Sequence, residues 1–110
     1  MCTEINIKEN MPTVFNALED LKGYIKIKKQ LGVSCLVIIH GYGSHGIGGE
    51  ICKKSRSYLK AQEKNNKLKK VIFGEDFDIY NKSSVRLNSK YKELNKYFCK
   101  YNHGITIIEL

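Results

Sequence analysis

The sequence lacks any long apolar segment. Its longest unbroken apolar run extends only from Cys35 to Ile39, which is far shorter than the roughly 20 residues of a membrane-spanning helix. The N-terminal sequence MCTEINIKEN contains an early acidic residue and no apolar stretch of the kind found in secretory signals. We therefore expect a cytoplasmic protein that has no membrane partner.

Closely spaced metal ligands are also missing. The four cysteines form no C-x-x-C pair, and the three histidines supply no such pair with any cysteine. In a chain without a secretory signal these cysteines are most simply reduced thiols, and we expect Cys35 to pack as a small hydrophobic residue. The sequence thus predicts no structural metal, and nothing in it points to another cofactor.

Arginine is scarce, with two residues, whereas lysine is abundant and the net charge is +8. A positive charge favours polyanionic partners, but a Lys-, Ile- and Asn-rich composition can also arise from an AT-rich genome. The distribution of charge is therefore more informative than the total. Residues 50–73 carry eight basic and two acidic side chains, a net +6, whereas the rest of the chain carries eleven and nine, a net +2. The excess charge directly follows a glycine-rich segment, although a solvated lysine-rich helix would also explain it.

At 110 residues the chain is long enough for one domain with a real core. A helix is predicted to begin near Asn10, with Pro12 in its first turn, and to end at Gly32. The run from Cys35 to Ile39 is typical of a central strand covered on both faces. The other predicted elements are a strand at 5–7, a loop at 40–49, a helix from 50 to the asparagines at 65–66, a strand at 70–73 ended by Gly74, a possible edge strand at 79–80, a helix over 85–98 and a terminal strand at 105–110. The order is β-α-β-α-β-(insert helix)-β.

The loop from His40 to Gly49 contains five glycines, and Gly41, Gly43 and Gly46 match the pattern G-x-G-x-x-G. A dinucleotide site would need this loop after the first strand and an acid about 20 residues further on, where this chain is instead rich in lysine. A P-loop is excluded because no Lys-Ser/Thr pair directly follows the last glycine. A purely structural turn remains an alternative, although so many glycines are costly in backbone entropy.

A third interpretation of the loop is a cradle for the phosphates of a polynucleotide. The loop leads into a helix, whose N-terminal amides and dipole favour an anion. Lysines of that helix can follow a sugar-phosphate backbone. Tyr42 lies among the glycines, where its ring can stack on a base. Loop and helix together therefore favour nucleic acid as the ligand.

The segment VIIHGYGSHGIGGEICKKSRSYL resembles the small MutS-related (Smr) domain, which has a strand, a His/Thr-Gly-x-Gly loop, further glycines and a helix. His40 to Gly43 match the tetrad, GITIIEL is similar to the last strand of the family, with Gly104 before it, and MPTVFNALEDLKGYI is similar to its first helix. On this resemblance residues 1–110 form a single Smr-like domain with a helical insertion at about 75–102. The resemblance implies an α/β fold of the α+β two-layer sandwich kind, with a four-stranded mixed sheet, related to the C-terminal fold of translation initiation factor three. It also implies binding of DNA or RNA, and endonuclease activity in parts of the family.

One motif departs from the family. Smr domains commonly carry Leu-Asp-x-His-Gly at the end of the first strand, and the aligned segment here runs from Ile5 to Glu9, with Asn6 in place of the acid and Lys8 in place of the histidine. Asn6 cannot act as a carboxylate base. Lys8 can neutralise a phosphate but is a poor general base unless strongly desolvated. Whether the domain is an enzyme therefore stays open.

The remaining candidates for catalysis are His40 and His45, since either can titrate near neutral pH. The alternatives are that His40 hydrogen-bonds backbone at the strand end and shapes the turn, and that His45 is an exposed loop residue. We expect the nucleic-acid-binding residues to be Lys8, His40, Gly41, Tyr42, Gly43, Ser44, Gly46, Gly48, Gly49, Lys53, Lys54 and Arg56. The predicted function is nucleic acid binding, with weak endonuclease activity as a further expectation. The alternative is an inactive protein-interaction or ribosome-associated module whose lysine face meets an acidic partner.

Overall fold

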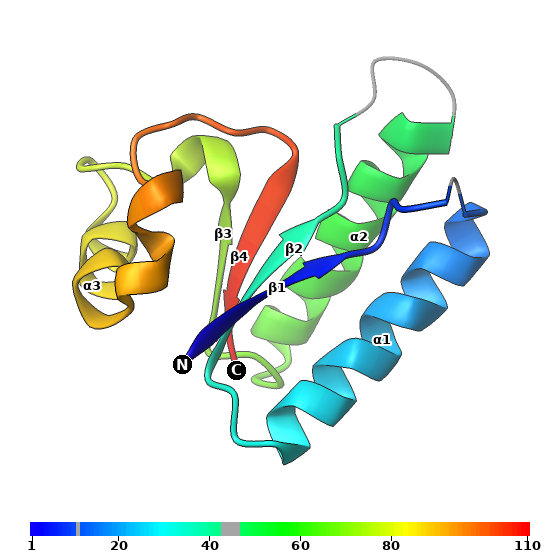
Figure 1. Cartoon of the computed structure of the whole chain (residues 1–110), viewed down its shortest axis with the longest axis horizontal. Helices are drawn as coiled ribbons and strands as arrows, with labels where there is room; N and C mark the ends of the chain where they lie inside the picture. The colour runs from blue at the N-terminus through cyan, green and yellow to red at the C-terminus, as the bar shows by residue number, and fades with distance from the viewer. Residues whose placement is uncertain (11, 43–46) are drawn as a thin grey trace.

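The computed structural model describes residues 1–10, 12–42 and 47–110, which build a four-stranded mixed sheet with helices on both faces (Figure 1). The elements along the chain are β1 (Cys2–Asn6), α1 (Val14–Gln30), β2 (Cys35–Ile39), α2 (Ile47–Lys64), β3 (Lys70–Phe73), the 3-10 helix η1 (Gly74–Asp76), α3 (Lys82–Lys90), the 3-10 helix η2 (Lys92–Tyr97) and β4 (Ile105–Glu109). The strand order is β1-β2-β4-β3, with β1 parallel to β2 and β4 antiparallel to both of its neighbours. The predicted fold class and element order are confirmed.

Strand β2 is central because its side chains are apolar on both faces. Leu36 and Ile38 pack with the residues of α1 and α2, whereas Cys35 and Val37 point to the opposite face, and all four are at most 1% exposed. Strand β4 is buried along its whole length as well. An unbroken apolar run is what a strand covered on two faces requires, and Cys35 packs as a small hydrophobic residue, as predicted.

Helix α1 begins later than predicted. Its N-cap is Thr13, whose hydroxyl oxygen accepts a hydrogen bond from the Asn16 amide at 3.1 Å. Asn10 instead has a φ of +64° and lies in the turn that follows β1. Both asparagine and threonine are common helix caps, so residue type alone does not decide between Asn10 and Thr13. The predicted stop at Gly32 is correct, because Gly32 has a φ of +80° just after the helix ends.

The segment between β3 and β4 covers the sheet face opposite α1 and α2 (Figure 1). The predicted single helix over 85–98 is wrong, because the backbone becomes extended at Tyr91 and separates α3 from η2. Leu87, Tyr91 and Leu94 all reach the core on the two sides of this break. Residues 79–80 lie in a turn instead of an edge strand.

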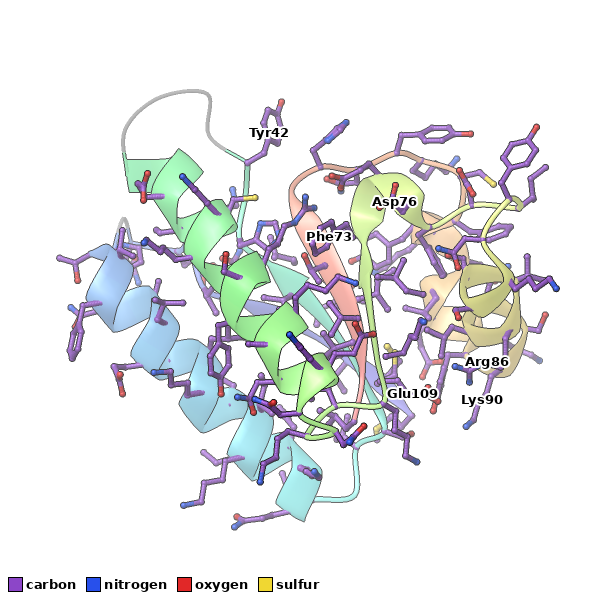
Figure 2. All side chains as sticks on the ribbon, turned by 180° about the vertical axis from the view of Figure 1, so that it is seen from behind. Tyr42, Phe73, Asp76, Arg86, Lys90 and Glu109 are labelled. Atoms are coloured by element: carbon purple, nitrogen blue, oxygen red, sulfur yellow. The ribbon has the colours of Figure 1, made fainter. Side chains whose placement is uncertain are left out.

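Helix α3 is fixed to the sheet by charge as well as by packing. Glu109 on β4 is 4% exposed, and its carboxylate accepts two hydrogen bonds from Arg86, at 3.2 and 3.0 Å, with Lys90 at 3.6 Å (Figure 2). The Arg86 guanidinium holds the pKa of the Glu109 carboxyl below its usual value. Among the described residues, no helix is long and apolar enough to cross a membrane.

Candidate functional site

The predicted site residues meet at the end of the sheet where β1 and β2 finish and β4 begins. His40 directly follows β2, Lys8 lies two residues beyond β1, and Gly104 directly precedes β4. The amides of His40 and Gly41 both donate to the carbonyl oxygen of Gly104, at 3.1 and 3.0 Å. Parallel β1 and β2 and antiparallel β4 therefore bring three distant parts of the sequence to one place.

His40 is buried in this arrangement, with 1% of its surface exposed. Its Nε2 lies 2.8 Å from the Thr106 hydroxyl, and its Nδ1 lies 2.5 Å from the Gly41 carbonyl oxygen. Burial lowers the pKa of His40 to about 4, so the imidazole is neutral near pH 7. A carbonyl oxygen only accepts, so Nδ1 carries the proton and Nε2 accepts from Thr106. This is the interpretation in which His40 shapes the turn at the strand end.

Arg56 of α2 continues the same network. Its Nε donates to the Thr106 hydroxyl at 3.1 Å, and its two terminal nitrogens bind the Glu75 carboxylate at 2.7 Å each. Further bonds reach the carbonyl oxygens of Ile105 and His103, at 2.9 and 3.2 Å. Burial opposes ionisation of Glu75, but the guanidinium outweighs it and lowers the pKa of this carboxyl. The guanidinium expected to contact nucleic acid is thus occupied within the protein.

Two residues of the polar network that joins α2 to the end of the sheet, Thr106 and Glu75, were not predicted from the sequence. Thr106 is the one polar residue in an otherwise apolar stretch, ITII, and this was an available signal. Glu75 belongs to no motif in the sequence. Neither residue's contact with Arg56, at a sequence separation of 50 and 19 respectively, follows from spacing alone.

Three exposed side chains surround this buried network: Lys8, Tyr42 and His103. The lysine chain passes over Gly41, since a Cβ built on Gly41 would lie 3.0 Å from its Cδ. Gly41 also has a φ of +67°, so glycine is favoured here for two reasons. The Tyr42 ring meets the His103 ring edge-on, with centroids 6.4 Å apart.

The glycine-rich segment is described in part. Gly43, Ser44, His45 and Gly46 lie outside the described residues, whereas Gly48 and Gly49 belong to the first turn of α2. Lys53 and Lys54 are exposed in the next turn. Lys53 lies three residues before Arg56 and therefore on the same side of the helix, one turn closer to the glycines. The Gly41 amide donates to the Gly104 carbonyl oxygen and is therefore not free to bind a ligand. The described amides that suit an anion are those in the first turn of α2, because the first amides of a helix have no partner within it.

We call the surface formed by Lys8, Tyr42, His103 and residues 48–54 the loop-end surface. Its described part combines two kinds of group that bind nucleic acid, namely ammonium groups for phosphates and an exposed aromatic ring for a base. The ion pairs among the described residues do not involve Lys8, Lys53 or Lys54. In the same part of the chain, no three potential metal ligands cluster together.

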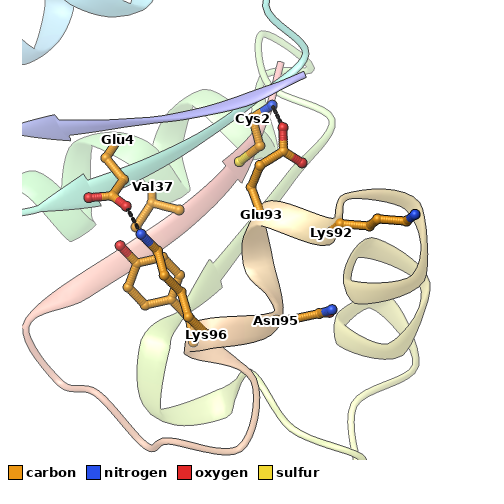
Figure 3. Close-up of a pocket in the computed structure, with 8 residues that line it drawn as sticks. Cys2, Glu4, Val37, Lys92, Glu93, Asn95 and Lys96 are labelled. Atoms are coloured by element: carbon orange, nitrogen blue, oxygen red, sulfur yellow. Dashed lines mark hydrogen bonds and ion pairs between the residues drawn. The ribbon is translucent and has the colours of Figure 1, made fainter.

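A hollow lies between the edge strand β1 and η2, away from the loop-end surface (Figure 3). Its volume is about 500 Å³, and it is lined by Cys2, Glu4, Val37, Lys92, Glu93, Asn95, Lys96 and Tyr97. The Glu93 carboxylate accepts from the Cys2 amide at 3.2 Å, and Lys96 pairs with Glu4. Glu93, Glu4 and Lys96 are therefore used to attach η2 to β1.

No family model matches the chain, and no curated protein matches it either. A solved structure does: the crystal structure of the Smr domain of Thermus thermophilus MutS2 aligns with 98% of this chain and 96% of its own, with a TM-score of 0.61 and 18% sequence identity. A likeness at this identity concerns the course of the backbone. The chain therefore has the fold of an Smr domain.

Proposed function

We propose that this domain binds DNA or RNA through the loop-end surface, with its phosphates near Lys8, Lys53 and the first turn of α2. The observation that carries the proposal is the course of Lys8 over Gly41, which brings an ammonium group from β1 to the start of the glycine-rich segment. The likeness of the fold to an Smr domain supports the same function.

The charges favour a polyanion at this surface. Helix α2 carries five basic and two acidic side chains between Ile47 and Lys64, and one of those acids, Glu63, pairs with Lys60 at the far end of the helix. The N-terminal amides of a helix and its dipole attract an anion. Lys53 lies in the turn next to that helix end, and Lys8 lies over Gly41, where the segment that leads to the helix begins.

We infer binding without cleavage by His40. A general base must reach the proton that it removes, but the His40 imidazole is buried and both of its nitrogens are occupied. Asn6 stands where the family has an acid. Its side-chain oxygen accepts hydrogen bonds from the amides of Lys8 and Glu9, at 2.9 and 3.1 Å. Asn6 therefore stabilises the turn that carries Lys8, and His40 stabilises the turn that carries Tyr42.

The experiment is a gel-shift titration of the protein with labelled DNA and RNA at 50 and 200 mM salt. Each neutralised phosphate adds about 0.9 to the slope of log affinity against log salt for duplex DNA and about 0.7 for single strands. The double variant Lys8→Ala/Lys53→Ala should bind more weakly, with a slope smaller by about 1.5. The control is Lys26→Ala/Lys67→Ala, which removes the same charge from exposed positions on the late part of α1 and beyond α2.

Equal losses of affinity in the two double variants would mean that binding depends on the net charge of the protein and not on where the lysines lie. That result would overturn the assignment to the loop-end surface. Absence of any binding at 50 mM salt would reject nucleic acid as the ligand. That outcome would favour the alternative module, whose lysine face meets an acidic protein.

A further inference from the structure

Aromatic side chains are exposed in three of the described segments at the loop end of the sheet. Tyr42 is 64% exposed, Tyr80 is 86% and Tyr101 is 53% exposed, and the His103 side chain is 62% exposed. They belong to different segments, since Tyr42 follows β2, Tyr80 follows η1, and Tyr101 and His103 precede β4. Burial in the core explains none of these rings.

The fold brings these loops together because β4 is antiparallel to both β2 and β3. The start of β4 therefore lies beside the ends of both neighbours, and Figure 2 shows Tyr42 and Asp76 along this same end. The Tyr42 and His103 rings are in edge contact, with centroids 6.4 Å apart. On the other side of β4, the Cys99 amide donates to the Phe77 carbonyl oxygen at 2.9 Å.

That second contact ties the loop that contains Tyr101 to the turn that contains Tyr80. Beneath it the rings of Phe77 and Phe98 meet edge-on, with centroids 5.2 Å apart. Two buried or half-buried phenyl rings thus support the backbone that presents two exposed tyrosines. The support is part of the core, whereas the tyrosines it presents face solvent.

The backbone before β4 is held in an unusual conformation at Cys99 and Tyr101, with φ values of +61° and +55°. Non-glycine residues rarely adopt this region, and a glycine would relieve it. A large aromatic side chain at Tyr101 adds little to folding when it is half exposed. A ligand for the ring would account for both the residue and its conformation.

We propose that Tyr42, His103, Tyr101 and Tyr80 form a stacking platform for the bases of single-stranded nucleic acid. The proposal rests on the proposed function and names its substrate class. Exposed aromatic rings beside cationic groups are how proteins bind single strands with little sequence preference. The bases of a duplex are stacked inside the helix and cannot reach these rings, so the platform selects single strands.

The charges around the platform suit a single strand that crosses it. Lys8 lies at one end, and Lys100 and Lys82 are exposed in the segments that carry Tyr101 and Tyr80. The acids there are Glu75, neutralised by Arg56, Asp78, whose carboxylate accepts a hydrogen bond from the Tyr80 amide at 2.9 Å, and the exposed Asp76 and Glu9. The lysines offer phosphates contacts at both ends of the platform, with the bases turned toward the rings.

The test compares three 12-residue probes by fluorescence anisotropy: an oligo-dT, an oligo-U and a DNA duplex. The variant is Tyr80→Ala/Tyr101→Ala. The control is Tyr24→Ala, which removes an exposed tyrosine from α1. Both variants are first checked by circular dichroism, and Tyr80→Phe/Tyr101→Phe retains the rings without the hydroxyls.

We expect wild-type protein to bind the single strands more tightly than the duplex. The alanine pair should weaken single-strand binding by about tenfold per ring, with an unchanged salt slope because no charge is lost. Duplex binding, the phenylalanine pair and Tyr24→Ala should behave as the wild type does. If the alanine pair weakens binding of only one of the two single strands, oligo-dT or oligo-U, the platform also distinguishes RNA from DNA.

Equal binding of duplex and single strands, with no effect of the alanine pair, would overturn the platform while leaving the proposed function in place. Absence of binding to all three probes would overturn both. A loss of affinity in the phenylalanine pair equal to that in the alanine pair would also contradict stacking, because it would assign the contact to the hydroxyl groups.

Discussion

Acid should destabilise this domain at a higher pH than its carboxylates alone would require, because His40 is buried as a neutral imidazole. The folded protein takes up a proton on His40 only near pH 4, whereas the unfolded chain does so near pH 6.5. Between these values the unfolded state holds more protons than the folded state. The free energy of unfolding is therefore at its full value above pH 6.5 and falls as the pH decreases through this range.

The size of the effect follows from the two pKa values. A pKa of about 4 against 6.5 corresponds to about 3 kcal/mol over the whole range and to about 2 kcal/mol by pH 5. This is a large part of the 5–15 kcal/mol that holds a typical domain together. The carboxyl groups of Glu75 and Glu109 have lowered pKa values, so their stabilising contributions are lost only below about pH 4.5. The two effects are therefore separated in pH.

The assay is urea unfolding, followed by circular dichroism, at pH 7.5, 6.5, 5.5 and 5.0. We compare wild type with His40→Gln, which retains a polar side chain but does not titrate. The variant should be less stable at pH 7.5, because its contacts with Thr106 and Gly41 are imperfect, yet its stability should change little with pH. His103→Gln, altered at an exposed position, is the matched control and should retain the wild-type dependence. If His40→Gln loses stability with acid as steeply as the wild type, the buried neutral imidazole is not the cause and this account of the site is wrong.

Three further changes test charge pairing and packing. Glu75→Gln should lower the free energy of unfolding by about 2–3 kcal/mol in urea titrations near pH 7, because it leaves the half-buried Arg56 without its counter-charge; an unchanged midpoint would show that the pair adds nothing. Gly74→Ala should destabilise the domain strongly, because its Cβ would overlap the Asn102 carbonyl oxygen, whereas a Cβ at Gly23 meets nothing within 4 Å. Gly23→Ala lies inside α1 and should raise stability by about 0.5–1 kcal/mol, and melting temperatures in the reverse order would contradict this packing.

The parts of the fold that could be predicted are those in which local pattern and tertiary environment agree. The run from Cys35 to Ile39 is apolar on both faces, so only a central strand buries it, and β2 is central. The terminal strand follows from the same argument. The helix that follows β2 was predicted as well, but it begins at Ile47 instead of residue 50 and so includes Gly48 and Gly49. Residues 43–46 of the predicted loop lie outside the described residues.

The parts that were predicted wrongly depend on tertiary choices. Leu87, Tyr91 and Leu94 have helical spacing and all reach one core, yet the chain leaves the helix at Tyr91, and this spacing does not reveal the break. Arg56 belongs to a lysine-rich helix face, and only the approach of β4 and η1 turns its guanidinium inward onto Thr106 and Glu75. Sequence spacing identified the end of the sheet where the candidate site lies, but it did not separate the buried network from the exposed residues around it.

The central claim is that nucleic acid binds at the loop end of the sheet. The most direct measurement is a titration of isotopically labelled protein with a 12-residue single strand, followed through its backbone amide resonances in two-dimensional NMR spectra. The account predicts shifts concentrated at Lys8, Tyr42, Lys53 and His103, with little change at Lys26. Shifts concentrated around Lys26 and the far end of α1, or spread evenly over the lysines, would contradict it.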